Sequence, residues 1–379
     1  MRIMAQILFV NLEGRIGGAE TSLLLMVKHL RGQFVINVAC PAMSPLLRSL
    51  ASLQANCYEL PELPNRSLSS IFSLSYWLKT NWRLLRIALR VKPDVIHTNS
   101  FYAAAASILA ALVTRKKLIM HARDLADFGI LSKFCNLFCE KVIAVSHAVE
   151  NSLINQGVNP EKIRVVYNGV DNVFLEQSSE NGISSSSTGL FEKSSFVFAH
   201  IAQFVPWKNH ITFLKAATIV SRHLPDARFV LVGDDIFGRD SHYKSELLSY
   251  TKNSPILEKI RFLGWQDNMH EVWPNIDCLV HTAGREPFGR VIIEAMAHKI
   301  PVIAVDSCGP SEIIQNRKTG ILVQAGDVKI LSVAMIKIAQ DTQFTDKLAN
   351  AGYEHTMSGF TADKTAAQIQ EVYTELLAV

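Results

Sequence analysis

Two glutamates in the last third of the chain have the spacing of paired ligand contacts. Glu286 and Glu294 are separated by seven residues that include a Phe-Gly step. The apolar run 291–297 predicts a buried helix, which puts Glu286 in the preceding loop and Glu294 inside the helix. A helix start leaves backbone N–H groups free, and glycine lets a phosphate come close, so an anion seat is predicted at 288–290. One carboxylate on each side of that seat suits a nucleoside diphosphate sugar. The spacing alone would favour a plainer interpretation, an ordinary surface glutamate and a helix-face glutamate beside a glycine turn.

Lys208 and two N-terminal glycines are further candidates for phosphate contact. A lysine ammonium can neutralise a diphosphate as a point charge and stabilise a departing nucleotide. Gly17 and Gly18 follow the first predicted strand and precede a helix, where backbone can approach a ligand. Their pattern is not G-x-G-x-x-G, which disfavours a nicotinamide enzyme. The neighbouring Glu20 either contacts an acceptor or simply stabilises the helix dipole.

His121 is expected at the carboxyl edge of a sheet, because it follows the predicted strand 117–120. His97 ends another predicted strand and is a weaker candidate. Arg123 and Asp124 either contact an acceptor or pair with each other. No D-x-D motif stands at a strand end, so no metal is expected, and positive side chains and helix amides would stabilise the leaving group instead.

The elements that position these residues alternate between short apolar runs and helical patterns. Predicted strands cover 7–10, 34–40, 94–97, 117–120, 142–145 and 163–166, then 196–201, 228–232, 260–263, 278–281, 302–305 and 320–323. Strands separated by helices indicate parallel sheets built from βαβ units, whose ligands bind beyond the carboxyl ends of the strands. The serine-rich segment 176–189 cannot build a core and is predicted to be a linker or loop.

Composition limits the partners. A chain of 379 residues with 49% hydrophobic residues and a net charge of +4 is long enough for two globular domains. Without a zinc-finger spacing, an RNP motif or a basic tail, nucleic acid is not an expected partner. The six cysteines are scattered, which is typical of reduced thiols and predicts a cytoplasmic location. No apolar run is long enough for a transmembrane helix, and the first one lacks a signal-peptide cleavage site.

A series of motifs resembles the family 4 retaining nucleotide-sugar glycosyltransferases, which have the GT-B fold. Each is weak alone, but their order along the chain is specific; they lie at 14–20, 94–97, 121–124, 145–146, 166–171, 206–209, 231–234, 262–264, 286–294 and 309–312. The resemblance implies an α/β protein with two facing Rossmann-like domains, parallel sheets and a cleft between them. Residues 1–175 would bind the acceptor, with the C-terminal helix 360–379 packing back on them, and residues 190–359 would bind the donor.

By resemblance, the protein moves a hexosyl unit from a nucleoside diphosphate sugar, with uridine first and guanosine second, to a hydroxyl of a glycan or lipid-linked acceptor. The reaction would retain the anomeric configuration without a metal. The implied catalytic residues are His121, Lys208 and Glu286. The implied donor contacts are Gly17, Gly18, Gln203, Lys208, Trp265, Gln266, Arg285, Glu286, Phe288, Gly289, Arg290 and Glu294. The implied acceptor contacts are Glu20, Arg123 and Asp124.

Several alternatives stay open. The family usually has an arginine five residues before the lysine, where this chain has Gln203, so Arg285 or Arg290 would have to supply the charge. Trp265 either lies beside the base or packs within the fold. Front-face attack is favoured over a double displacement with a Glu286 nucleophile. Because Gln203 stands where the family usually has an arginine, the protein could also be a non-catalytic partner that only binds a nucleotide-sugar. A nucleotide-sugar 2-epimerase shares the two-domain plan but lacks this pair of glutamates.

A predicted helix at 76–92 suggests contact with a membrane. Its basic residues recur at spacings of four, three and four, which places them on one stripe: Lys79, Arg83, Arg86 and Arg90. Its apolar residues Trp77, Leu78, Trp82, Leu85 and Leu89 occupy another face, which would pack on the sheet. The absence of acidic residues from 65 to 92 favours an anionic lipid surface as a partner and a peripheral location on the cytoplasmic membrane face.

Overall fold

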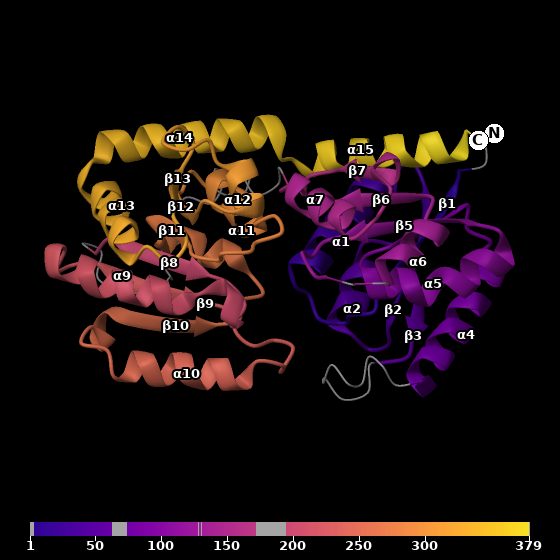
Figure 1. The fold of residues 1–379 in the computed structure, drawn as a ribbon, viewed down its shortest axis with the longest axis horizontal. Coiled ribbons are helices and arrows are strands. Elements are labelled where there is room, and N and C mark those ends of the chain that lie inside the picture. The colour runs from indigo at the N-terminus through magenta and orange to yellow at the C-terminus, as the bar shows by residue number, and fades with distance from the viewer. Residues whose placement is uncertain (1–3, 63–73, 128, 130, 172–194, 379) are drawn as a thin grey trace. The chain divides into compact units, whose positions relative to one another are not determined.

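The chain forms two compact units, which are described separately (Figure 1). The computed structural model describes residues 4–62, 74–127, 129, 131–171 and 195–378. Unit 1 comprises Met1–Gly169 and Ala362–Val379, and unit 2 comprises Val170–Thr361. The predicted linker 176–189 lies outside the described residues.

Unit 1 is a parallel sheet covered by helices. Its strands are ordered β3-β2-β1-β4-β5-β6-β7, with bounds β1 Gln6–Val10, β2 Val35–Pro41, β3 Asn56–Leu60, β4 Val95–Thr98, β5 Lys117–Ala122, β6 Lys141–Ala144 and β7 Ile163–Val165. The helices are α1 Gly18–Leu30, α2 Pro45–Ser52, α4 Leu74–Val91, α5 Phe101–Thr114, α6 Leu131–Phe138, α7 His147–Asn155 and α15 Ala362–Leu377. Helices between successive strands give the parallel arrangement that the sequence predicts.

The C-terminal helix α15 completes the core of unit 1 (Figure 1). Its buried residues, including Ile369, Val372 and Tyr373, pack in one hydrophobic cluster with Ile7 and Phe9 of β1. Burial of one such apolar side chain stabilises the fold by about 1.5–3 kcal/mol. The last turns of the sequence are therefore part of the first unit's core.

Unit 2 repeats the plan with six parallel strands in the order β10-β9-β8-β11-β12-β13. The strands are β8 Val197–Ile201, β9 Arg228–Val232, β10 Ile260–Gly264, β11 Cys278–His281, β12 Val302–Val305 and β13 Ile321–Val323. The helices are α9 His210–His223, α10 Ser241–Lys252, α11 Arg290–Ala297, α12 Cys308–Ile313, α13 Val328–Gln340 and α14 Thr342–Gly359. In both units, the carboxyl ends of all the strands meet at one edge of the sheet. The predicted site residues of each unit lie at or near that edge.

Two features differ from the sequence expectation. The sequence analysis missed β3, an edge strand whose residues are mostly half-buried or exposed, because it lacks the apolar run of a central strand. Strand β5 extends through Ala122, so His121 lies within the strand, fully buried, and not just after it. None of the helices in the described ranges is long and apolar enough to span a bilayer.

Candidate active site

A lysine and a glutamate separated in sequence meet at the carboxyl edge of unit 2. Lys208 ends a short 3-10 turn after β8, and Glu286 lies in the loop between β11 and α11. Their side chains form an ion pair and are only 13% and 9% exposed. The same carboxylate oxygen, Glu286 Oε2, accepts a hydrogen bond from His281 Nε2 at 3.1 Å. The sequence motifs predict separate tasks for Lys208 and Glu286 but not this direct contact.

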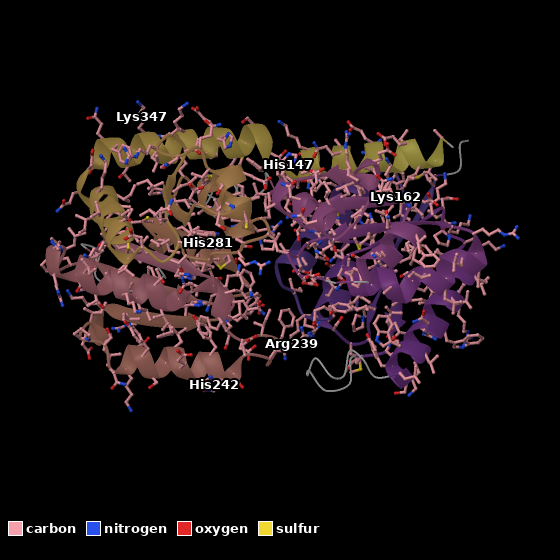
Figure 2. All side chains as sticks on the ribbon, viewed as in Figure 1. His147, Lys162, Arg239, His242, His281 and Lys347 are labelled. Carbon is pink, nitrogen blue, oxygen red and sulfur yellow. The ribbon has the colours of Figure 1, made fainter. Side chains whose placement is uncertain are left out.

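The electrostatics of this cluster keep its carboxylate ionised. Burial alone would raise the pKa of Glu286, but the Lys208 ammonium and the His281 hydrogen bond outweigh burial and lower it to about 2. Burial lowers the pKa of His281, against the opposing effect of Glu286. His281 is thus a neutral imidazole that donates through Nε2, and Figure 2 marks it inside unit 2.

Backbone contacts hold the loop that carries Glu286. The N–H of Gly309, at the start of α12, donates to the carbonyl of Glu286 at 3.0 Å. A side chain at Gly309 would not fit, because its Cβ would lie 2.4 Å from the Cα of Phe288. Gly289, the N-cap of α11, has φ 98°, a left-handed conformation that favours glycine. The glycine positions therefore fix the glutamate loop against a second helix.

The turn that carries Lys208 is fixed from behind by buried polar groups. The Thr282 hydroxyl lies 3.1 Å from the carbonyl of Lys208 and 2.9 Å from that of Asn209. His200 Nε2 lies 2.8 Å from the same hydroxyl. On the outer side, Lys208 Nζ lies 4.1 Å from the ring centroid of Trp207, which is 44% exposed. The ammonium is held between a carboxylate and an aromatic face.

Glu294 lies within α11, as the sequence predicts, and pairs with Arg290 one turn earlier. The distance from Arg290 Nη2 to Glu294 Oε1 is 2.9 Å. The N-cap of α11 is Gly289, which has no side chain of its own to cap the helix. Phe288 is buried, with its ring 6.1 Å from that of Phe360 by centroids, and Arg285 is exposed. The structure thus places the residues of the predicted phosphate seat around one helix start.

The predicted base contacts follow β10, and the predicted leaving-group contact Gln203 follows β8, as Lys208 does. Trp265, 40% exposed, donates from Nε1 to Asp267 at 2.9 Å, and Gln266 donates to the carbonyl of Leu263 at 2.7 Å. Gln203 follows β8 and is partly buried. Gly233 lies so close to this strand end that a Cβ would come within 2.0 Å of the Ala202 carbonyl oxygen. These residues share the carboxyl edge of the sheet with Lys208.

Unit 1 has a different cluster at its carboxyl edge. His121 Nδ1 lies 3.2 Å from Nε2 of His97, and His97 Nδ1 lies 2.6 Å from the hydroxyl of Tyr373. Arg123 Nη2 also approaches His121 Nδ1, at 3.4 Å. Burial and the Arg123 charge lower the pKa of His97 to about 3. Burial, then Arg123 and His97, hold the pKa of His121 well below its ordinary value.

Arg123, a predicted acceptor contact, is buried and holds strand ends together. Its Nε donates to Asn99 at 2.8 Å and its Nη1 donates to Asn168 at 2.9 Å. Asn99 in turn donates to Asn11 at 2.9 Å. A guanidinium with these partners organises the edge of the sheet, whereas Asp124 is exposed beside it.

Glu20, also predicted to contact the acceptor, is buried in the first turn of α1. Its carboxylate accepts from the N–H of Gly17 at 3.1 Å and from Asn11 at 3.4 Å. This contact closes the helix N-terminus, as a capping carboxylate does. Burial raises the pKa of Glu20 to about 7. Gly17 is the N-cap of α1, and Gly18 is its first residue.

Sequence analysis missed His281, His200, Tyr373 and the three asparagines. His281 ends an apolar strand, so its position was a usable signal. Tyr373 gave none, since its partner lies 276 positions away. Among the described residues, no group of three His, Cys, Asp or Glu side chains is arranged to hold a metal ion.

The surface of α4 differs from the prediction. Its buried face consists of Tyr76, Thr80, Leu84, Ile87, Ala88 and Val91. The apolar stripe expected to pack on the sheet is largely exposed: Leu78 is 62% exposed, Trp82 62% and Leu89 52%. The buried face has its own apolar side chains, Leu84, Ile87 and Val91, so the predicted stripe is not the one that packs on the fold. The basic stripe is exposed beside them.

Two family descriptions match the chain in series. "Glycosyltransferase Family 4" matches residues 16–173, and "Glycosyl transferases group 1" matches residues 185–355. N-acetyl-α-D-glucosaminyl L-malate synthase of Bacillus anthracis is 29% identical over 78% of this chain and 78% of its own length. The UDP-Gal:α-D-GlcNAc-diphosphoundecaprenol α-1,3-galactosyltransferase of Escherichia coli is 23% identical over 91% of this chain and 90% of its own.

Solved structures agree with these matches. The crystal structure of Anabaena HepE in complex with UDP-glucose has a TM-score of 0.85 at 25% identity, and the match covers 98% of this chain and 99% of that one. A glycosyltransferase from Rickettsia africae has a TM-score of 0.84 at 22% identity, over 99% of each chain. With both family matches and this common architecture, the chain belongs to the family 4 glycosyltransferases of the GT-B fold.

Proposed function

We propose that this protein transfers a hexosyl unit from a UDP-sugar to a hydroxyl of a glycan or lipid-linked acceptor in cell-surface polysaccharide synthesis, with retention of the anomeric configuration. The observation that carries the proposal is the ion pair of Lys208 and Glu286, held by His281 at the carboxyl edge of unit 2. The names of the relatives support the substrate class, since one acts on a diphosphoundecaprenol-linked sugar and one solved neighbour contains UDP-glucose.

The donor would bind to unit 2. Lys208 supplies the positive charge for the diphosphate, and the start of α11 at Gly289 supplies backbone N–H groups. Glu286 accepts hydrogen bonds from hexose hydroxyls, and Glu294 with Arg290 binds the nucleoside side. Gln203 contributes hydrogen bonds without charge, so Arg285 supplies the second positive charge of the leaving-group clamp.

The proposed reaction is a front-face substitution. The bond from the anomeric carbon to the acceptor oxygen forms as the bond to the diphosphate oxygen breaks, and the acceptor proton moves to that phosphate oxygen. Lys208 stabilises the departing charge without a metal. A carboxylate whose pKa is lowered to about 2 by an ammonium and an imidazole is a weak nucleophile. This argues against a double displacement through Glu286.

Unit 1 would bind the acceptor. Asp124 is exposed at the carboxyl edge and is the direct contact that we favour. Arg123 and Glu20 support the edge from inside, through the asparagines and the α1 N-terminus. Both are thus assigned an indirect part in acceptor binding.

A lipid-linked acceptor requires a membrane surface, and α4 has the features of a docking helix. Its exposed apolar side chains Leu78, Trp82 and Leu89 would enter the interface, and its basic stripe would meet anionic headgroups. Each basic residue near such a surface contributes about 1 kcal/mol, which salt screens. We propose peripheral attachment to the cytoplasmic membrane face through this helix.

Vesicle sedimentation tests the docking. Wild-type protein should bind phosphatidylglycerol vesicles more strongly than phosphatidylcholine vesicles, and salt should weaken binding. A variant with Gln at all four basic positions, Lys79, Arg83, Arg86 and Arg90, should lose the preference for phosphatidylglycerol vesicles. The variant L78S/W82S/L89S should bind both kinds of vesicle more weakly at any salt concentration. A matched four-fold Gln variant of exposed unit 2 residues, at Arg222, Lys252, Lys318 and Lys347, should bind as wild type. Equal effects of the two four-fold variants would exclude α4 docking.

Product analysis tests the transfer itself. The protein would be incubated with UDP-sugars, with and without a bacterial lipid extract, and the products examined by NMR. We expect release of UDP and a new glycosidic bond of retained configuration only with the extract. Epimerised donor in the absence of extract would support the epimerase alternative, and binding without turnover would support the non-catalytic one.

A further inference from the structure

Three side chains of unit 1 form one continuous chain of hydrogen-bonding groups. The Tyr373 hydroxyl lies 2.6 Å from His97 Nδ1, and His97 Nε2 lies 3.2 Å from His121 Nδ1. The last atom of the chain, His121 Nε2, is buried and has no hydrogen-bond partner among the described residues. A buried polar atom without a partner costs free energy, and a functional role is one explanation for keeping such an atom.

The direction of this chain is fixed by Arg123. A guanidinium has only donors, and its Nη2 faces His121 Nδ1 at 3.4 Å. The Nδ1 atom must therefore accept, which places the single proton of a neutral His121 on Nε2. His97 must then donate through Nε2 and accept through Nδ1, so the Tyr373 hydroxyl donates. Burial lowers the pKa of both imidazoles and keeps them neutral.

We propose that Tyr373 and His97 are positioning residues that fix His121 as the neutral Nε2–H tautomer, so that unit 1 presents an uncharged hydrogen-bond donor to a sugar hydroxyl. The nature of the partner rests on the proposed function, and the tautomer does not. An uncharged N–H can donate to a hydroxyl oxygen without adding a second positive charge to the edge where the Arg123 guanidinium already lies.

The packing of Tyr373 allows a test that leaves the core intact. Its ring is fully buried and meets Phe34 edge-on, with centroids 5.3 Å apart. Tyr373→Phe keeps this ring and removes only the hydroxyl, which leaves His97 Nδ1 without its donor. His97 is then free to adopt the other tautomer, which opposes the Nε2–H form of His121.

Imidazole ¹⁵N NMR of the full-length protein reads the tautomer directly and needs no substrate. We expect His121 to be entirely Nε2–H in wild type and a mixture in Tyr373→Phe. Tyr353→Phe, the same change on α14, should leave the His121 signals unchanged. An unchanged His121 tautomer in Tyr373→Phe would overturn the proposal, even if no glycosyl transfer has been detected.

A pair of His97 variants gives an independent test if Tyr373→Phe does not fold. A glutamine amide can take the place of Nε2 and donate to His121, whereas an asparagine amide reaches only the place of Nδ1. His97→Gln should therefore keep the His121 tautomer and most of the turnover. His97→Asn should lower kcat about tenfold with a smaller change in KM, as expected for one lost hydrogen bond. Equal losses in both variants would indicate a purely structural role.

Discussion

The two carboxyl edges use histidine in opposite electrostatic settings. His121 in unit 1 lies beside Arg123, and His281 in unit 2 lies beside the carboxylate of Glu286. Burial keeps both imidazoles neutral. Only the N–H of His281 donates its hydrogen bond to an anion, the Glu286 carboxylate. One edge thus presents a histidine donor without a partner among the described residues, and the other presents a fixed carboxylate–ammonium pair. The group that each histidine contacts, and not its place near the carboxyl end of a strand, therefore determines the chemistry that the edge can support.

The largest expected effect is on the charged edge. Lys208→Met should lower turnover by about 10²–10³-fold, the cost of losing one strong stabiliser of departing charge. It should also destabilise the fold by about 3–5 kcal/mol, because Glu286 is left as a buried unpaired charge. Kinetics and urea unfolding measure the two losses.

A double variant separates these effects. Lys208→Met with Glu286→Gln should recover most of the stability but none of the turnover, because the unpaired charge is gone and the phosphate contact is not restored. Lys215→Met, an exposed lysine on α9, is the control and should change neither. If the double variant regained activity, Lys208 would not be a catalytic contact.

Two buried carboxyls predict opposite pH dependences. Burial raises the pKa of Glu20 to about 7, so the folded protein binds this proton more tightly than the unfolded chain does. Protonated Glu20 therefore adds to the free energy of unfolding at low pH, and this contribution is lost as the pH rises from about 4.5 to about 7. The loss is on the order of 3 kcal/mol. Glu20→Gln keeps the contact with Gly17 and should remove the loss, so the stability difference from wild type should change between pH 5 and pH 8.

Glu286 has the opposite effect on the pH dependence of stability. Its lowered pKa gives a contribution that is present above about 4.5 and is lost as pH falls toward about 2. Urea unfolding at several pH values distinguishes the two carboxyls. Glu354→Gln, at an exposed position on α14, should give a curve parallel to that of wild type. A Glu20→Gln curve parallel to both would refute the assignment.

The two glutamates of unit 2 should differ in what they bind. Glu294→Ala should weaken UDP binding, whereas Glu286→Ala should mainly lower turnover, each by about 1.5–3 kcal/mol for a lost charge-assisted hydrogen bond. Calorimetry with UDP and steady-state kinetics separate the effects, with the exposed Glu246→Ala as control. Equal loss of UDP affinity in both glutamate variants would contradict the division of roles.

The smallest expected effect is that of a chelator. If Lys208 and the α11 start stabilise the leaving group, excess EDTA should leave turnover unchanged. Complete loss with rescue by Mg²⁺ or Mn²⁺ would contradict the proposed mechanism.

The parallel α/β architecture of both units could be predicted from the sequence because each central strand is an apolar run between helical patterns. The edge strand β3 could not, because its residues are partly exposed. Glu286 and Lys208 were recognisable from motifs, but their ion pair depends on the packing of two loops 78 positions apart. The Tyr373 contact depends on the return of α15 to the core of unit 1. The outward stripe of α4 was predicted inward because periodicity gives the stripes of a helix and not the face that is buried.

A thermal-unfolding screen with nucleotide-sugars tests the central claim most directly, since a ligand that binds the native state raises the apparent stability by mass action. Wild-type protein and Lys208→Met would be compared with UDP-, GDP-, ADP- and dTDP-hexoses. We expect the UDP-sugars to raise the Tm of wild type, and we expect this shift to be lost in Lys208→Met but kept in Lys215→Met. No shift with any nucleotide-sugar, or the same shift in wild type and Lys208→Met, would contradict a nucleotide-sugar site at the Lys208–Glu286 edge.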